Sequence, residues 1–439
     1  MWSTHFGGTV AGVDSAEPVE IVVDSTGASV VLGVLKGKAD FGGGFLTSAG
    51  GQDIYLVKYS ATGAYVWSAR FGGAQNEVPK GIAIDSADNV VITGFFAGTV
   101  DFGGGPITGS SASGFVAKYS PAGAHLWSRR LSTGSVLDEG TAIGVDGPGN
   151  VIVAGGFYGT VNFGGGSLTS AGSEDIVLLK YNSAGAFLWS KPVGGASDEL
   201  VMSLAVDSTT GEFVTAGYFS GTVDFGGGRF TSLGSTDAFV ARYDSSGGPV
   251  WSKQWGSSFE DKAYGVALDR FGDVAVTGMF TDNVDFGGGP ITNVGGSGSG
   301  DIFLVKLSAG GVHTWSRGFG SSLAANQFGY GVAFDGAGDV LLTGLIVALT
   351  SPYTIDLGGG PITGDGYSNA FIAKYRPDGS HAWSNRYLGG GDHAGGLAIA
   401  ADAGDNVRSV GYYNNSINLG GATLTSPGWT DTYLVKLGP

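Results

Sequence analysis

Three short motifs recur along the chain at a spacing of about 60 residues, and each occurs seven times. A Trp-Ser pair begins at Trp2, Trp67, Trp127, Trp189, Trp251, Trp315 and Trp383. An Asp/Asn-Phe/Leu-Gly-Gly motif begins at Asp40, Asp101, Asn162, Asp224, Asp285, Asp356 and Asn418. An apolar run carries a cation at Lys58, Lys118, Lys180, Arg242, Lys306, Lys374 and Lys436. Such self-similarity restricts the fold to repeat architectures, in which each unit buries its apolar face against its neighbours.

One unit, from residue 81 to residue 130, reads as four strands separated by turns. Alternating or β-branched runs predict strands at 81–85, 90–94, 115–119 and 125–130. A glycine-rich connection that contains Asp101 to Gly105 separates the second strand from the third. No helical period is evident. Four strands in each repeat are typical of a β-propeller blade, whereas the coils of a β-helix are far shorter.

The two ends of the chain complement each other. The last repeat stops after its third strand at residues 433–437, and the chain begins with Trp2-Ser3, which opens the fourth strand in the other repeats. We therefore predict an all-β fold, a seven-bladed β-propeller of four-stranded antiparallel blades that forms one domain over residues 1–439. Residues 1–8 are expected to close the ring by completing the blade that ends at residue 437, which removes an open sheet edge.

Composition excludes several classes of protein. Glycine supplies 84 of the 439 residues, yet 12% aromatic and only 14% charged residues do not fit a disordered chain. A net charge of −16 argues against binding nucleic acid or an anionic membrane surface. No apolar run is long enough to insert into a bilayer. The chain lacks cysteine, which removes disulfides and thiolate chemistry.

Three sequence segments resemble the bacterial seven-bladed β-propeller repeat family (SBBP), in particular surface or exported proteins of the myxobacterial type. They are Asp-Ile-Phe-Leu-Val-Lys at 301–306, Trp-Ser-x-x-Phe-Gly-Gly, and the turn and strand at 85–94. The resemblance covers essentially the whole chain. It implies the propeller fold and a secreted or cell-surface location, although the N-terminus has no signal-peptide pattern. It implies no reaction.

Residues that recur in every repeat are expected to serve the fold. An Asp opens the first tight turn of each repeat, where its carboxylate can accept backbone N–H groups. The Asp of the glycine motif is replaced by Asn162 and Asn418, a change that a turn cap tolerates and a metal ligand does not. The Trp of Trp-Ser is expected to pack between blades.

Acidic residues lie in the connection that leads into most repeats. Glu77, Glu139, Glu199 and Asp261 are our candidate metal ligands, because clustered carboxylates suit a hard cation such as Ca²⁺. We expect these acids to ring the mouth of the central channel, on the same face as the long glycine loops. The simpler interpretation, which we favour, is a solvated acidic face without a ligand.

A second group of residues departs from the repeat in or beside the long loops of the sixth and seventh repeats. The group combines aromatic, amide, acidic and imidazole side chains that suit sugar rings or peptide segments, and loops often carry specificity. These candidate ligand-binding residues are Tyr353, Tyr367, Trp429, Asn326, Gln327, Asp392 and His393.

The sequence therefore predicts a non-enzymatic, monomeric binding propeller that holds a protein or glycan on the long-loop face. No residue is predicted to be catalytic. The acidic candidate ligands make Ca²⁺ the one cofactor that the sequence suggests. One alternative is a polysaccharide hydrolase or lyase that uses carboxylates at the channel mouth. The other is a purely structural surface module.

Overall fold

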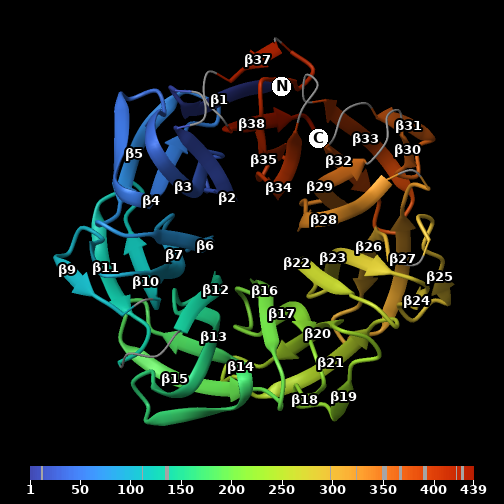
Figure 1. Ribbon diagram of the computed structural model, residues 1–439, viewed down its shortest axis with the longest axis horizontal. Helices are drawn as coiled ribbons and strands as arrows, with labels where there is room; N and C mark the ends of the chain where they lie inside the picture. Colours follow the sequence, from blue (N-terminus) through green and yellow to red (C-terminus); the bar gives the residue numbers. More distant parts are fainter. Residues whose placement is uncertain are drawn as a thin grey trace.

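A computed structural model describes residues 1–439 except 11–12, 111, 134–137, 297, 323, 349–352, 365–367, 389–392, 422 and 427–429. Within the described residues every regular element is a β-strand, so the chain is all-β. Antiparallel sheets follow one another around a common axis, and the first and last strands lie side by side (Figure 1). This arrangement is that of a β-propeller. No helix among the described residues is long and apolar enough to cross a membrane.

Each repeat forms a set of four antiparallel strands, named in order from the axis outward. Pairing of residues 7–8 with 39–40, and one parallel bridge between residues 300 and 326, join neighbouring sets into larger sheets. The first half of the chain forms β2 (Ser15–Val23), β3 (Ser29–Asp40), β4 (Phe45–Tyr59) and β5 (Tyr65–Phe71); β6 (Glu77–Ile84), β7 (Val90–Phe96), β10 (Ser113–Tyr119) and β11 (His125–Arg130); β12 (Asp138–Val145), β13 (Val151–Asn162), β14 (Ser167–Tyr181) and β15 (Phe187–Val193); and β16 (Glu199–Val206), β17 (Phe213–Phe219), β20 (Asp237–Tyr243) and β21 (Pro249–Trp255).

The second half continues the same pattern. It forms β22 (Lys262–Leu268), β23 (Val274–Thr281), β26 (Gly300–Leu307) and β27 (His313–Phe319); β28 (Ala324–Phe334), β29 (Val340–Ala348), β32 (Ser368–Tyr375) and β33 (His381–Leu388); and β34 (Ala394–Ala401), β35 (Val407–Tyr413), β38 (Asp431–Leu437) and β1 (Trp2–Gly8). The last of these sheets joins the two ends of the chain.

The glycine-rich connection is more regular than the sequence suggested. In five sheets it forms a separate two-stranded hairpin, and in the other two it extends the second and third strands. Asp101 explains the turn, because its Oδ1 accepts the N–H groups of Gly103 (2.7 Å) and Gly105 (3.0 Å). The separate hairpins are β8 (Thr99–Asp101) with β9 (Pro106–Thr108), β18 (Thr222–Asp224) with β19 (Arg229–Thr231), β24 (Val284–Asp285) with β25 (Pro290–Ile291), β30 (Tyr353–Asp356) with β31 (Pro361–Gly364), and β36 (Ser416–Asn418) with β37 (Thr423–Thr425).

The hydrophobic core lies between neighbouring sheets. In one representative cluster, Val214 and Val240 of one sheet pack with Val276 and Val305 of the next, and all four side chains are buried. Packing on both faces explains why the second and third strands are almost continuously apolar. The repeated Trp anchors one sheet to the next: Trp67 donates its indole N–H to the Pro121 carbonyl in a turn of the following sheet (3.1 Å). The predicted packing role of this Trp is confirmed.

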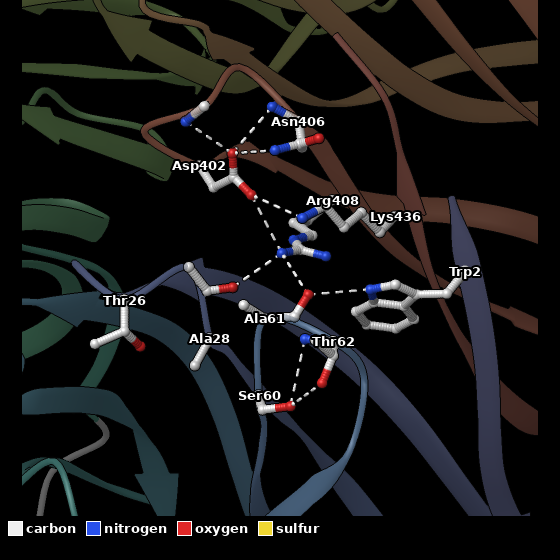
Figure 2. A network of polar contacts seen from close by, with 12 residues as sticks. Trp2, Thr26, Ala28, Ser60, Ala61, Thr62, Asp402, Asn406, Arg408 and Lys436 are labelled. Atoms are coloured by element: carbon white, nitrogen blue, oxygen red, sulfur yellow. Dashed lines mark hydrogen bonds and ion pairs between the residues drawn. The ribbon is translucent and has the colours of Figure 1, made fainter.

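The seam between the chain ends has contacts of its own. β1 pairs antiparallel with β38 from Trp2 opposite Lys436 to Phe6 opposite Thr432. Figure 2 shows the buried Arg408 guanidinium beside Asp402 (3.2 Å), within reach of the Ala61 carbonyl that also accepts the Trp2 indole N–H. The Arg408 guanidinium also lies 5.1 Å from the Trp2 ring centre. Side chains from both ends of the chain therefore meet in one polar network.

Candidate functional site around the axis

A cavity of about 170 Å³ lies on the axis, where the innermost strand of every sheet contributes to its wall. Among its described lining residues Glu20 is the one carboxylate, and burial raises its pKa to about 7. Its Oε2 accepts the Ile82 N–H of the next sheet (2.9 Å). Glu20 departs from the repeat: the six aligned positions hold Gly81, Ala142, Ser203, Gly265, Gly331 and Ala398.

Two tyrosine rings line this cavity, and a phenylalanine ring packs against them. The Tyr264 and Tyr330 ring centres are 5.3 Å apart, and Phe328 stacks on Tyr330 at 5.4 Å with only 4° between the planes. All three side chains are half-buried. Tyr264 and Tyr330 line the axial cavity, while Phe328 lines an adjoining pocket of about 300 Å³. We call Tyr264, Phe328 and Tyr330 the aromatic cluster.

The sequence analysis did not select the aromatic cluster. The sequence nevertheless marks the two tyrosines as departures from the repeat. They occupy a position that in the other repeats holds Val19, Lys80, Thr141, Met202 and Leu397. Proximity was not readable from the chain, however, since the two tyrosines are 66 positions apart in sequence. Only the stacking of β22 against β28 brings their rings together.

Three of the four candidate metal ligands are buried, so the expectation that they face solvent at the channel mouth is wrong for them. Glu77, Glu199 and Asp261 are at most 1% exposed. Glu77 and Glu199 each accept a backbone N–H, from Gly73 (2.8 Å) and Gly195 (2.9 Å) respectively. They begin β6 and β16. The sequence predicted the first of these strands at 81–85, whereas β6 already starts at Glu77, and Glu77 is buried as a result.

The buried acids lie in separate interfaces rather than in one ring. Asp261 accepts the N–H groups of Ser257 (2.6 Å) and Thr281 (2.8 Å). Burial raises the pKa of Glu77 and of Glu199 to about 7, and that of Asp261 to about 6. The described residues contain no group of three or more His, Asp or Glu side chains that could hold a metal ion. Each acid thus caps its own loop.

The fourth candidate metal ligand, Glu139, behaves differently. Its side chain is half-buried and lines a pocket of about 190 Å³ with Phe95, Tyr158 and Glu174. Burial raises the pKa of Glu139, whereas the Lys80 ammonium lowers it. Glu139 is therefore a carboxylate held at a surface pocket, and it is separate from the buried caps.

Among the candidate ligand-binding residues, Tyr353 is placed differently from the prediction. It is fully buried in the core beside Ile355 and Phe371, so the expected exposed aromatic at this position is wrong. The physical reason is that residues 353–356 form β30, whose hairpin folds back on the sheet and buries alternate side chains. Tyr367, Trp429 and Asp392 lie outside the described residues.

Of the remaining candidates, Asn326 and Gln327 both contact Gly300, and His393 contacts Ser368 instead. Asn326 is half-buried beside Phe328, and its Oδ1 accepts the Gly300 N–H (2.8 Å). Gln327 is buried and, with its amide N–H groups facing these acceptors, donates to the Gly300 carbonyl (3.1 Å) and to Asp301 (2.9 Å). His393 is exposed, with its Nδ1 3.0 Å from the Ser368 hydroxyl. Gln327 thus caps a loop, and Asn326 adjoins the aromatic cluster.

The chain is similar to two curated proteins, and no family model matches it. It is 22% identical over 456 residues to an uncharacterized WD repeat-containing protein of Acanthamoeba polyphaga mimivirus, an alignment that covers 84% of this chain and 32% of that protein. It is 27% identical over 290 residues to the regulatory protein FlaEY of Caulobacter vibrioides, covering 61% of this chain and 29% of that protein. The chain therefore spans about a third of the length of these relatives.

Among solved structures, the β-propeller domain of the trilobed protease from Pyrococcus furiosus aligns with 95% of this chain and 96% of its own, at a TM-score of 0.44 and 8% identity. The WD-repeat relative supports a propeller repeat family. The narrower resemblance to SBBP proteins stays a prediction, as does the export that it implies.

Proposed function

We propose that the chain is a non-enzymatic interaction module, a seven-bladed propeller that binds a partner protein on its long-loop face around the axial cavity. The fold supports a binding role, since propellers commonly present loops of unlike sequence on a rigid ring. The β1–β38 pairing and the polar network at the seam support a closed ring. The sequence resemblance supports a secreted or cell-surface bacterial setting.

The observation that carries the proposal is the aromatic cluster. Half-buried aromatic rings supply large, rigid contact area, and such side chains dominate measured binding hot spots. Tyr264, Phe328 and Tyr330 break the internal repeat and meet at one edge of the axial cavity. Asn326 and Glu260 line the same adjoining pocket and add polar groups for orientation. The opposite face offers tight turns of nearly constant sequence.

A peptide and glycan array probed with the purified protein, with and without Ca²⁺, tests the proposal. Substitution of both Tyr264→Ala and Tyr330→Ala should weaken binding of any array ligand at least ten-fold, or about 1.4 kcal/mol. Phe271→Ala is the matched control, because Phe271 is 70% exposed in a tight turn on the opposite face. Unchanged binding by the double variant, or loss of binding in the Phe271 variant, contradicts the assignment.

The same array separates the two alternatives. A purely structural module binds nothing on the array, and a polysaccharide hydrolase or lyase releases new sugar ends from a glycan it recognises. If the array shows binding to glycans and not to peptides, the partner is a carbohydrate and not a protein.

A further inference from the structure

The 190 Å³ pocket lies between two neighbouring sheets on the long-loop face. Phe95 of β7 forms one wall, and Glu139 of β12, Tyr158 of β13 and Glu174 of β14 form the others. Its volume corresponds to about six waters at roughly 30 Å³ each, which accommodates one extended side chain. The aromatic cluster does not contribute to it.

The pocket exists because one sheet departs from the repeat at three positions that meet there. The second strand of every sheet contains a glycine, which is Gly155 in β13. The residue after it is Gly156 in β13, whereas the aligned positions of the other sheets hold Val34, Phe95, Tyr218, Met279, Leu345 and Tyr412. Tyr158 is the one aromatic at its aligned position, which elsewhere holds Lys36, Ala97, Ser220, Thr281, Val347 and Asn414. Glu174 is the one acid at its aligned position. The other sheets hold Gln52, Ala112, Thr236, Gly300, Ser368 and Thr430 there.

The three departures are physically linked. A Cβ at position 156 would lie 2.0 Å from Glu174 Oε1, so the missing side chain makes the space that Glu174 enters. The Tyr158 hydroxyl donates to Glu174 Oε2 (2.8 Å) and holds that carboxylate in the pocket. Because a repeat protein supplies its own internal comparison, three coupled departures in one pocket indicate a local role that the other sheets lack.

The charge of the pocket is unbalanced. Glu174 is only 9% exposed, and burial together with the neighbouring Glu139 and Asp198 carboxylates raises its pKa. The cation that faces both glutamates is Lys80, which lowers the pKa of each. Lys80 Nζ lies 5.8 Å from the Phe95 ring centre, so one cation already lies beside this wall of the pocket. An additional cation would relieve the remaining repulsion between the carboxylates.

We propose that this pocket receives the cationic side chain of an arginine or lysine from the partner polypeptide. The carboxylates of Glu139 and Glu174 hold the charged end, and the Phe95 ring packs on the aliphatic stem. This inference rests on the proposed function, since it specifies the chemistry of one point of contact with the partner. It adds a site away from the aromatic cluster.

Small probes test the pocket on the isolated protein. N-acetyl-arginine amide, N-acetyl-lysine amide and the neutral N-acetyl-glutamine amide are titrated and followed by calorimetry and by chemical-shift changes. One or both cationic probes should bind, and the glutamine probe should bind at least ten-fold more weakly. Glu139→Gln and Glu174→Gln should each lower the affinity at least ten-fold.

Two further variants separate pocket effects from folding effects. Gly156→Tyr restores the kind of side chain that Tyr218 supplies at the aligned position, so it should fill the pocket and abolish probe binding. Glu17→Gln is the matched control, because Glu17 occupies in β2 the register position that Glu139 occupies in β12 and lies outside the pocket. It should leave the affinity unchanged. Melting curves of all four variants establish that they are folded.

Three results would overturn the inference. The first is equal binding of neutral and cationic probes, or probe affinity that survives both glutamine substitutions. The second is Ca²⁺ binding that both substitutions abolish while neither cationic probe binds, which assigns a metal site instead. The third is release of reducing ends from a neutral polysaccharide that depends on both glutamates, which assigns a hydrolase. Because the probes need no natural partner, their failure leaves the array test of the aromatic cluster intact.

Discussion

At the scale of single residues, recurring acids and bases form buried pairs. Asp85 accepts the backbone N–H groups of Ala87 and Asn89 (2.9 Å each) and also contacts the Lys118 ammonium at 2.8 Å. The same pairing joins Asp146 to Lys180 at 3.0 Å. The sequence predicted the turn cap, which is confirmed. It did not predict the partner, because the ammonium comes from the third strand of the sheet and only pairing of the strands places it there.

A second class of buried acid, to which Glu199 belongs, accepts a backbone N–H group and makes stability depend on pH. The pKa of Glu199 is ordinarily near 4.5 and rises to about 7 on folding, mainly through burial. The folded state therefore binds more protons than the unfolded state between these two values, and stability falls as pH rises through that window. We expect the free energy of unfolding to decrease from pH 5 to pH 8, measured by urea titration.

Glu199→Gln should reduce the slope of this pH profile, while Glu20 and Glu77, whose pKa values also rise to about 7, keep the rest of it. The amide oxygen still accepts the Gly195 N–H, and the neutral side chain no longer has to ionise in a buried place. The variant should therefore be more stable than the parent at pH 8 by about 1 kcal/mol or more. Asp378→Asn, in an exposed turn where hydrogen bonds from Ser380 lower the pKa of Asp378, should keep the parent slope in this window. A parent profile without slope contradicts the prediction.

At the scale of elements, paired glycines end the outermost strand of a sheet where the chain turns back toward the axis. A Cβ on Gly194 would lie 2.2 Å from the Asp175 carboxyl carbon, and one on Gly195 would lie 2.2 Å from the Thr222 carbonyl oxygen. The same crowding occurs at Gly72 and Gly73. The glycines therefore recur because the connection packs directly against a carboxylate and a backbone carbonyl, a contact that any side chain would block.

Gly195→Ala should be destabilising by about 2 kcal/mol or more, because the added methyl group overlaps a backbone atom that cannot rotate away. Gly421→Ala is the control: it also follows a turn glycine, yet the nearest atom to its added Cβ would be 4.0 Å away. Thermal melting of the two variants gives the comparison. Similar melting temperatures for both would show that the connection relaxes freely.

At the scale of the whole molecule, the first strand pairs with the last and with the first sheet. β1 supplies the outer neighbour of β38 and, through Gly7 and Gly8, also pairs with β3. The Gly8 N–H donates to Asp431 (2.9 Å), and the Trp2 indole donates to the Ala61 carbonyl (3.1 Å). Backbone and side chains of the first eight residues thus hold the last sheet against the first.

Deletion of residues 1–8 should therefore lower the melting temperature strongly or cause aggregation. The deletion exposes the β38 edge, which can then pair with other chains, and it leaves Asp431 without the Gly8 N–H. Differential scanning calorimetry and light scattering measure the two effects. Removal of Pro439 alone is the control, since this residue is exposed and lies outside β38. A full-length melting temperature in the deletion variant would rule out a closing role for β1.

The sequence alone determined the features that depend on local chemistry. Strand positions, the turn-capping acids and the interface tryptophans follow from side-chain alternation, short-range hydrogen bonds and size, and all of these recur in every repeat. The tertiary structure decided which of the residues that differ from the repeat are buried and which are accessible to a partner. Tyr353 is buried because its hairpin folds over the sheet, whereas Tyr264 and Tyr330 remain half-buried because two inner strands converge on the axis. Gly156, Tyr158 and Glu174 form a pocket only because adjacent strands align, a relation that spacing along the chain does not carry.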